Sequence, residues 1–413
     1  MPSPAAWNAL VLEPELAALA AEAPAAARER RRRMADNAGD FIRGSLGLVA
    51  RWLALNPLAD APWVWSAGDA HQGNFSTLAT GRADRHGIVP VTYDVSDVDD
   101  EHPAPWWWDH ARLLASLPAA APDLRRSDLA ELATALLSDY QRTLAKVADG
   151  DDLALRLDLH GLPEVLKRMI EDESADGLAE GHLAGFVARS GDRLQRSQRA
   201  DDDVKAAAAI IPAITAALAK RSDVTRTTVL DLARRTTGGG LASLGRRRWW
   251  VLVSEEHRRG LRRLRLLELK ERRPSTLAGV LPAQPFSPRK ATMQGLTVAM
   301  GGDPCQRSIR LGASELLLRT RCHTRTVIDL TALDAGDRRR LACTWGQLLA
   351  RYHVNGWTLL GRDAAEKAAA VADDATRRGN QVAERTRDLA SLLAATHTAF
   401  AKSTAMASRR QGK

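Results

Sequence analysis

The chain has 413 residues, 45% of them apolar, and a formal net charge of +9. Its length exceeds the usual range of a single domain, so we expect two lobes or domains with ample apolar residues for a core. The positive charge suits an anionic ligand, whereas no zinc-finger spacing or RNA-binding aromatic motif supports nucleic acid as a specific partner. The N-terminus lacks a secretory pattern and no window approaches about 18 apolar residues, which predicts a cytoplasmic protein without a membrane partner.

Residues 1–33 are rich in Ala, Glu and Arg and are expected to be helical. Arg43 comes directly after the apolar pair Phe41 and Ile42. It could clamp a phosphate or a carboxylate, because a guanidinium favours bidentate contact with such groups, or it could be an ordinary surface arginine. Residues 46–55 have a broad apolar face and predict a helix.

The segment 68–74 is bounded by glycines, is too turn-rich for a helix, and holds Asp69 and Asn74 five positions apart. This D-x-x-x-x-N spacing matches the catalytic loop of kinases, in which the aspartate is the base and the asparagine is a metal ligand. Strand-like runs at 62–65 and 88–93 surround it, and an acidic cluster follows at Asp94, Asp97, Asp99 and Asp100. Phosphoryl transfer needs such groups: one carboxylate takes the proton of the acceptor hydroxyl, while an amide oxygen and another carboxylate hold Mg²⁺. The alternative is a polar turn followed by a solvated acidic loop.

Three consecutive tryptophans at 106–108 lead into Asp109 and an amphipathic helix. The tryptophans could stack on a ligand ring, but packing between a loop and a helix bundle is the more ordinary role. Capping of the helix N-terminus is the default role for Asp109. Helical periodicity then predominates from 124 to 222.

The pattern changes near residue 225, where strand-like runs at 227–232 and 249–253 flank a glycine-rich segment. Gly240, Ala242 and Gly245 keep the spacing G-x-G-x-x-G with alanine in the middle position. Small residues let backbone N–H groups approach an anion, so this hairpin could cover nucleotide phosphates, although a plain hairpin is the alternative.

The next alternating run, 264–270, ends at Lys270. A kinase lysine lies on the strand after the glycine-rich hairpin and contacts the α- and β-phosphates, whereas the alternative is an exposed lysine at a strand end. Further strands are expected at 316–319 and 326–330, and helices from 337 onward and over 364–401. Gly346 is expected to allow close contact between helices.

These motifs together resemble a family of uncharacterised bacterial proteins related to protein kinases and aminoglycoside phosphotransferases. The matching pieces are Arg-Met-x7-Ile-Arg-Gly at 33–44, Gly-Asp-Ala-His-x-x-Asn-Phe at 68–75, Asp-Val-Ser-Asp-Val-Asp-Asp at 94–100, Pro-Trp-Trp-Trp-Asp-x-x-Arg-Leu-x-Ala-Ser at 105–116, Gly-x-Ala-Ser-Leu-Gly-x-x-Arg-Trp at 240–249 and Leu-x-Leu-Lys-Glu at 267–271. In ordinary kinases the glycine-rich loop and the lysine precede the catalytic loop, whereas here they follow it.

The resemblance implies an α+β, protein-kinase-like two-lobe fold in circularly permuted order. Residues 1–224 would form a helical catalytic lobe, and residues 225–335 a small β-rich, nucleotide-binding lobe with an antiparallel sheet. Residues 336–413 would form helices that pack back on the large lobe.

The resemblance also implies roles for individual residues. Asp69 would be the catalytic base, Asn74 and Asp97 would bind Mg²⁺, and Asp99 would be a second metal carboxylate. Asp109 would brace the catalytic loop. The residues implied for the phosphates are Gly240, Ser243, Gly245 and Lys270, and from the residues themselves we also expect Ala242 and Arg43 to contribute to nucleotide binding. The glutamate partner of Lys270 is not evident; Glu315 is a candidate, or Thr292 occupies its position.

We therefore expect an ATP- and Mg²⁺-dependent phosphotransferase that acts on a small molecule or another hydroxyl-bearing acceptor, which the sequence does not identify. Adenylyl transfer or ATP-dependent ligation would use the same nucleotide site, and a nucleotide-binding pseudokinase would regulate a partner. A metal hydrolase built on Asp94, Asp97, Asp99 and His71 is a further alternative. It differs from the others in that it would need neither the glycine-rich hairpin nor Lys270.

Overall fold

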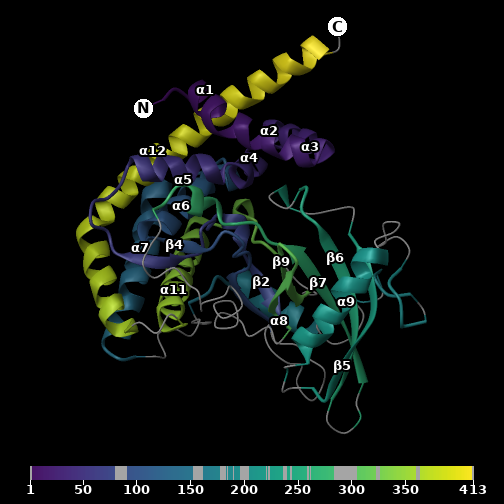
Figure 1. Ribbon diagram of the computed structural model, residues 1–413. Helices are drawn as coiled ribbons and strands as arrows, with labels where there is room; N and C mark the ends of the chain where they lie inside the picture. Colours follow the sequence, from purple (N-terminus) through teal and green to yellow (C-terminus); the bar gives the residue numbers. More distant parts are fainter. Residues whose placement is uncertain are drawn as a thin grey trace.

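The computed structural model (Figure 1) describes most of the chain. The residues outside the description are 1, 80–90, 152–160, 177–182, 184, 189, 196–203, 220, 222–223, 236–239, 242–243, 258–259, 261, 283–304, 322–325, 360–362 and 412–413.

The first part of the chain is mostly helical and contains two small antiparallel strand pairs, β1–β4 and β2–β3. Its elements are α1 (Pro4–Trp7), η1 (Asn8–Leu12), α2 (Glu13–Glu22), α3 (Pro24–Asp36), α4 (Ala38–Gly44), α5 (Leu46–Leu55), β1 (Trp63–Ser66), η2 (Gln72–Asn74), β2 (Phe75–Ala79), β3 (Val91–Val95), β4 (His102–Pro105), α6 (Trp107–Ala120), α7 (Arg126–Ala148) and α8 (Glu164–Asp176). The helix expected over 1–33 is interrupted at Ala23, where φ is −148°. Pro24 explains the break, because a residue before proline is disfavoured in the α region.

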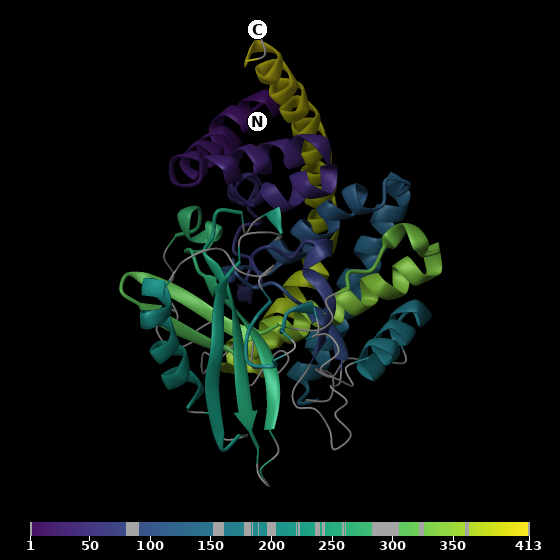
Figure 2. The same ribbon diagram turned by 90° about the vertical axis from the view of Figure 1, so that its right-hand side faces the viewer.

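The second part of the chain carries a larger sheet and the longest helices. Its elements are α9 (Val204–Leu218), β5 (Arg226–Arg234), β6 (Arg248–Glu256), β7 (Arg262–Glu271), η8 (Thr276–Gly279), β8 (Arg307–Leu311), β9 (Ser314–Thr320), η9 (Leu330–Ala332), α11 (Ala335–Leu359) and α12 (Ala364–Gln411). The five strands are antiparallel in the order β5-β6-β7-β9-β8. The fold is therefore a mixed α+β arrangement, with a helical lobe beside an antiparallel sheet (Figure 2).

The two faces of this sheet differ because side chains alternate along a strand. Trp249 and Leu267 lie on one face, in a core with Ile210 and Ile214 of α9. Glu268 and Lys270 alternate with the leucines on β7 and therefore lie on the opposite face. Because α9 shares the core of the sheet, the sheet lobe includes a helix that precedes residue 225.

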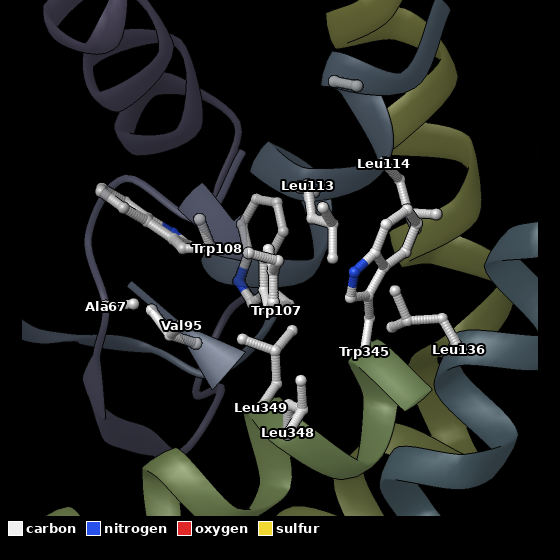
Figure 3. Packing of buried hydrophobic residues seen from close by; sticks show 14 of the residues in the cluster. Ala67, Val95, Trp107, Trp108, Leu113, Leu114, Leu136, Trp345, Leu348 and Leu349 are labelled. Atoms are coloured by element: carbon white, nitrogen blue, oxygen red, sulfur yellow. The ribbon is translucent and has the colours of Figure 1, made fainter. Parts of the chain in front are cut away.

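The core of the helical lobe forms where α6, α7 and α11 meet. Trp107 of α6 and Trp345 of α11 are buried among leucines from these helices, as Figure 3 shows. Trp106 and Trp108 are also buried, at 0% and 4% exposure. The three consecutive tryptophans are core residues, so they offer no surface on which a ligand ring could stack.

Gly346 lies where α11 crosses α7. A Cβ atom at this position would lie 2.2 Å from the Leu136 carbonyl oxygen, which is closer than van der Waals contact. The expected close helix contact at this glycine is confirmed.

The long helix α12 packs on α6, α7 and α3, and also contacts α1 near the chain's first residues (Figure 1). It ties the early helices to those that follow. Among the helices that the structure describes, none combines the length and apolar character needed to cross a membrane.

The strand expected at 326–330 is wrong. The backbone N–H of Thr77 in β2 donates to the Thr326 carbonyl oxygen at 3.1 Å, and the Thr326 N–H donates to Thr77 Oγ1 at 2.8 Å. Asp329 then accepts a bond from the Thr331 N–H and caps η9, so the apolar run turns instead of continuing a ladder.

Candidate functional site

The loop that carries Asp69 is pressed against the acidic segment. Gly68 has φ +80°, and a Cβ atom there would lie 1.9 Å from the Asp100 carbonyl oxygen. Only glycine accepts both this left-handed conformation and the close approach of a second backbone. The sequence around Gly68 therefore fixes how closely the Asp69 loop and the acidic segment meet.

Asp109 braces this loop from helix α6. Its carboxylate accepts bonds from the Ser66 hydroxyl at 2.8 Å and from the Ala67 backbone N–H at 2.9 Å. The Gly68 N–H donates to it at 3.2 Å, and His353 Nε2 lies 3.1 Å from it. Asp109 lies within α6 and is 1% exposed. We expected its carboxylate to cap the N-terminus of the helix, but it binds the Asp69 loop instead.

Asp69 is buried beside Arg112 of α6. The Arg112 Nε and Nη2 atoms lie 2.8 and 2.7 Å from Asp69 Oδ1, and Nη2 also donates to the Ile42 carbonyl oxygen. Burial raises the pKa of Asp69, while Arg112 opposes that rise. His71 Nε2 lies 3.7 Å from Asp69 Oδ2. A carboxylate with these neighbours is positioned in one orientation and is more basic than a surface aspartate.

The backbone of Asn74 is bonded to Ser96, the residue that precedes Asp97. The Asn74 backbone carbonyl accepts bonds from the Ser96 N–H at 2.7 Å and the Ser96 hydroxyl at 3.1 Å. The Asn74 side-chain Nδ2 donates to the Asp69 carbonyl oxygen at 2.8 Å. This bond uses the amide nitrogen, so the amide oxygen, the atom that can bind a cation, is left for other contacts.

Lys270 reaches the acidic segment from the sheet. Its ammonium forms an ion pair with the Asp99 carboxylate and lies 4.0 Å from Asp97 Oδ1. Arg246 Nη1 donates to the same Asp99 carboxylate at 2.9 Å. The expected meeting of Lys270 and Asp97 is therefore present, although these residues are far apart in sequence.

Asp100 links the helical lobe to the segment that follows β7 through hydrogen bonds from uncharged donors. The Thr276 N–H and hydroxyl both donate to its carboxylate at 2.9 Å, and the Ser275 hydroxyl donates to its carbonyl oxygen at 2.7 Å. Burial and the nearby Asp69 charge raise the pKa of Asp100.

Glu268 lies on the same face of β7 as Lys270 and is surrounded by arginines. Arg319 Nη2 and Arg235 Nη1 lie 3.0 and 3.4 Å from it, and Arg248 forms a further ion pair. Burial alone would raise the pKa of Glu268, but Arg319, Arg248 and Lys270 lower it. The sheet face thus carries more basic than acidic groups where it meets Asp97 and Asp99.

The glutamate expected beside Lys270 is not Glu315. Glu315 Oε1 pairs with Arg272 Nη1 at 3.1 Å and also accepts a bond from the Ser308 hydroxyl at 2.7 Å. Thr292 lies outside the described residues.

The glycine-rich hairpin is described only in part. Gly240 is exposed, whereas Ala242 and Ser243 lie outside the described residues. Gly245 has φ +79°, and a Cβ atom there would lie 2.8 Å from Leu19 Cδ1 of α2. The turn before β6 is therefore held against the helical lobe.

Arg43 lines a cavity of about 260 Å³. The cavity is lined by Gly39, Ile42, Arg43, His71, Gln72, Gly73, Ser116, Ala119, Ala120, Val327, Ile328, Asp329 and Leu330. Asp97, Asp99 and Lys270 are not among these residues.

In the part of the chain that the structure describes, no group of three His, Cys, Asp or Glu side chains is close enough to hold an ion. Asp94 is buried and forms an ion pair with Arg351, which removes it from the set with Asp97, Asp99 and His71.

A family described as an uncharacterised protein conserved in bacteria (DUF2252) matches residues 22–403. The chain belongs to the DUF2252 family. The match includes every site residue discussed above. No curated protein and no solved structure matches the chain.

Sequence reasoning on this DUF2252 chain missed two buried residues of the site, Arg112 and His353. Both lie inside helices and are 1% and 0% exposed. Arg112 orients Asp69, whereas His353 lies between Asp109 and the Tyr140 hydroxyl, which is 2.7 Å from Nδ1. The signal available for Arg112 was its place one helical turn after Asp109, which puts both on the same helix face.

Proposed function

We propose that this DUF2252 protein is an ATP- and Mg²⁺-dependent phosphotransferase with kinase-like lobes in circularly permuted order. One observation carries the proposal: Lys270, which belongs to the sheet, lies beside Asp97 and Asp99, which belong to the helical lobe. The Lys270 Nζ atom lies 4.0 Å from Asp97 Oδ1. A lysine on the strand after a glycine-rich hairpin, facing metal-binding carboxylates, is the arrangement that kinases use.

Charge supports a triphosphate as the ligand between the lobes. Lys270 and Arg246 both contact Asp99, while Arg319 and Arg248 contact Glu268. These cations would bind phosphate oxygens, since charge-assisted bonds of this kind are the strong ones. The ion pairs with Asp99 would then be exchanged for contacts with the nucleotide.

The donors around the acidic segment fit Mg²⁺. The oxygens of Asn74, Asp97 and Asp99 are hard ligands, and Mg²⁺ is commonly held by one or two carboxylates together with substrate phosphates and water. Bound there, the ion would neutralise charge on the phosphates and orient them.

Asp69 is suited to the role of base. The acceptor hydroxyl oxygen would form a bond to the γ-phosphorus while the bond from that phosphorus to the β–γ bridging oxygen breaks. The hydroxyl proton would pass to the Asp69 carboxylate and ADP would leave. Because its pKa is raised by burial, Asp69 takes a proton more readily than an exposed aspartate.

The test compares Asp69→Asn, Asp97→Asn and Lys270→Met with the unaltered protein, in ATP, Mg²⁺ and a panel of hydroxyl-bearing acceptors. We expect Asp69→Asn to lower turnover by roughly 10²–10⁴-fold, the usual contribution of a general base. Lys270→Met should weaken nucleotide binding, and removal of the metal by a chelator should abolish turnover. Lys367→Met, at a lysine with 42% side-chain exposure, is the matched control.

Product analysis separates the alternatives. ADP supports phosphoryl transfer, whereas AMP or pyrophosphate would indicate adenylyl transfer or ligation. ATP binding that depends on Lys270 without turnover would indicate a pseudokinase. Equal activity in all variants would refute the assignment of the site.

A further inference from the structure

The cavity beside Arg43 opens next to the candidate base. His71 lines the cavity and places Nε2 3.7 Å from Asp69 Oδ2. Gln72 and Gly73 of the same loop form another part of the lining, and Ser116 comes from α6. A molecule held there would lie against His71, the residue whose ring is next to the candidate base.

Arg43 places a guanidinium at the wall of the cavity. Its side chain is 40% exposed, and Nη1 lies 3.9 Å from Asp40 Oδ1, beyond hydrogen-bonding distance. Asp40 is already engaged by Arg33, which donates to both carboxylate oxygens at 2.8 and 3.1 Å. The charge of Arg43 is therefore compensated only weakly by Asp40.

Gly73 lets Arg43 lie over the loop. A Cβ atom at Gly73 would be 2.7 Å from Arg43 Nη2 and 3.1 Å from His71 Cε1. The guanidinium is thus packed between the loop and the cavity, where its planar group can make paired bonds to an oxyanion.

The other polar groups of the lining serve mainly to hold the walls. The Gln72 N–H donates to the Ser116 hydroxyl oxygen at 3.0 Å, and Gln72 Nε2 donates to the Ile328 carbonyl at 2.7 Å. Asp329 accepts bonds from the Thr331 N–H and hydroxyl at 2.9 and 2.7 Å. Ile42 and Leu330 add apolar surface. The cavity is therefore lined by polar and apolar groups alike, with the carboxylate of Asp329 bonded to Thr331 and the guanidinium of Arg43 able to pair with an oxyanion of a ligand.

We propose that this cavity binds the acceptor, and that the acceptor is a hydroxylated small molecule with an oxyanion that pairs with Arg43. The oxyanion is a carboxylate or a phosphate monoester. The assignment of the ligand as acceptor rests on the proposed phosphotransferase function, because only that function requires a hydroxyl to approach Asp69. Anion binding itself does not depend on it.

The test measures binding without nucleotide by calorimetry, using glucose, gluconate and glucose 6-phosphate. These probes share a polyhydroxylated six-carbon skeleton and differ chiefly in the charged group. We expect at least one of the two anions to bind at least tenfold more tightly than glucose, and Arg43→Gln to remove that preference. Arg32→Gln, at an arginine with 62% side-chain exposure, should keep it. Preference for gluconate or for glucose 6-phosphate distinguishes a carboxylate from a phosphate.

Equal binding of the three probes, binding of none, or an unchanged preference in Arg43→Gln would overturn the proposal. ATP binding is measured separately with Lys270→Met. If nucleotide binds through Lys270 while the anions show no preference, the acceptor proposal fails and the proposed function stands. If the anions bind through Arg43 but ATP does not bind, the proposed function fails and the cavity remains an anion site.

Discussion

At the scale of single residues, the same carboxyl group behaves differently according to what surrounds it. Burial raises the pKa of Glu101 to about 7, although Trp65 Nε1 and the Tyr352 hydroxyl donate to it at 3.2 and 2.9 Å. Glu268 is equally buried, but Arg319 and Arg248 lower its pKa. Uncharged donors therefore do not offset the effect of burial on the pKa of Glu101, whereas the positive charges of the arginines do offset it at Glu268.

Glu101 predicts a pH dependence of stability. The carboxyl binds a proton more tightly in the folded protein than in the unfolded chain, so its favourable contribution is complete below the ordinary pKa of 4.5. That contribution is lost as pH rises to about 7, and the loss is on the order of 3 kcal/mol. Glu101→Gln should flatten the dependence of the unfolding free energy on pH between 5 and 8, as measured in urea.

The comparison for this variant is Glu366→Gln, at a glutamate with 73% side-chain exposure. It should leave the pH dependence unchanged. If Glu101→Gln has the same slope as the unaltered protein, Glu101 does not titrate in this range.

At the scale of elements, two glycines in helices predict opposite effects. A methyl group at Gly346 would lie 2.2 Å from the Leu136 carbonyl oxygen, which would force α11 away from α7. At Gly379 of α12 the nearest atom would be Leu137 Cδ1 at 3.9 Å, an ordinary contact. We expect Gly346→Ala to destabilise the protein by about 3 kcal/mol or more.

Gly379→Ala should instead stabilise the protein by up to about 1 kcal/mol, because alanine favours the helix without a clash. Chemical denaturation of both variants checks the pair. Equal effects would mean that α11 and α7 can separate at little cost.

The sequence predicted elements where a periodic pattern was strong. The strand around Trp249 followed from a continuous apolar run, the strand that ends near Lys270 followed from alternation, and helix α6 followed from its apolar stripe. The run at 326–330 misled because an apolar pair beside a cavity looks like a buried strand, while the cap formed by Asp329 depends on tertiary position. His353 carries no periodic signal, since a single polar residue in a helix does not show what it faces, and the signal for Arg112 is its place one helical turn after Asp109. The meeting of Lys270 with Asp97 could be expected only from the combination of motifs.

At the scale of the whole molecule, the helical lobe and the sheet have largely separate hydrophobic cores. Leu389 of α12 belongs to the first, and Leu267 of β7 belongs to the second. Polar contacts at Asp99 and Asp100 link the lobes, and Leu317 of β9 packs in the first core. Cores that are largely separate predict two unfolding transitions.

Scanning calorimetry of Leu389→Ala and Leu267→Ala tests this prediction. Each substitution removes a fully buried side chain and should cost about 2–5 kcal/mol. We expect Leu389→Ala to lower the transition of the helical lobe and Leu267→Ala to lower that of the sheet. A single transition shifted by both variants would show that the lobes unfold as one unit.

The packing of α12 also has a consequence for synthesis on the ribosome. Trp106 donates to Asp374 of α12 at 2.9 Å, across 268 residues of sequence. At roughly 5–20 residues per second, translation needs tens of seconds to cover that interval. During this time the nascent tryptophan cluster lacks its final cover and presents an apolar surface that chaperones recognise. Newly made chains should therefore depend on chaperones more than a mature chain that refolds with α12 already available.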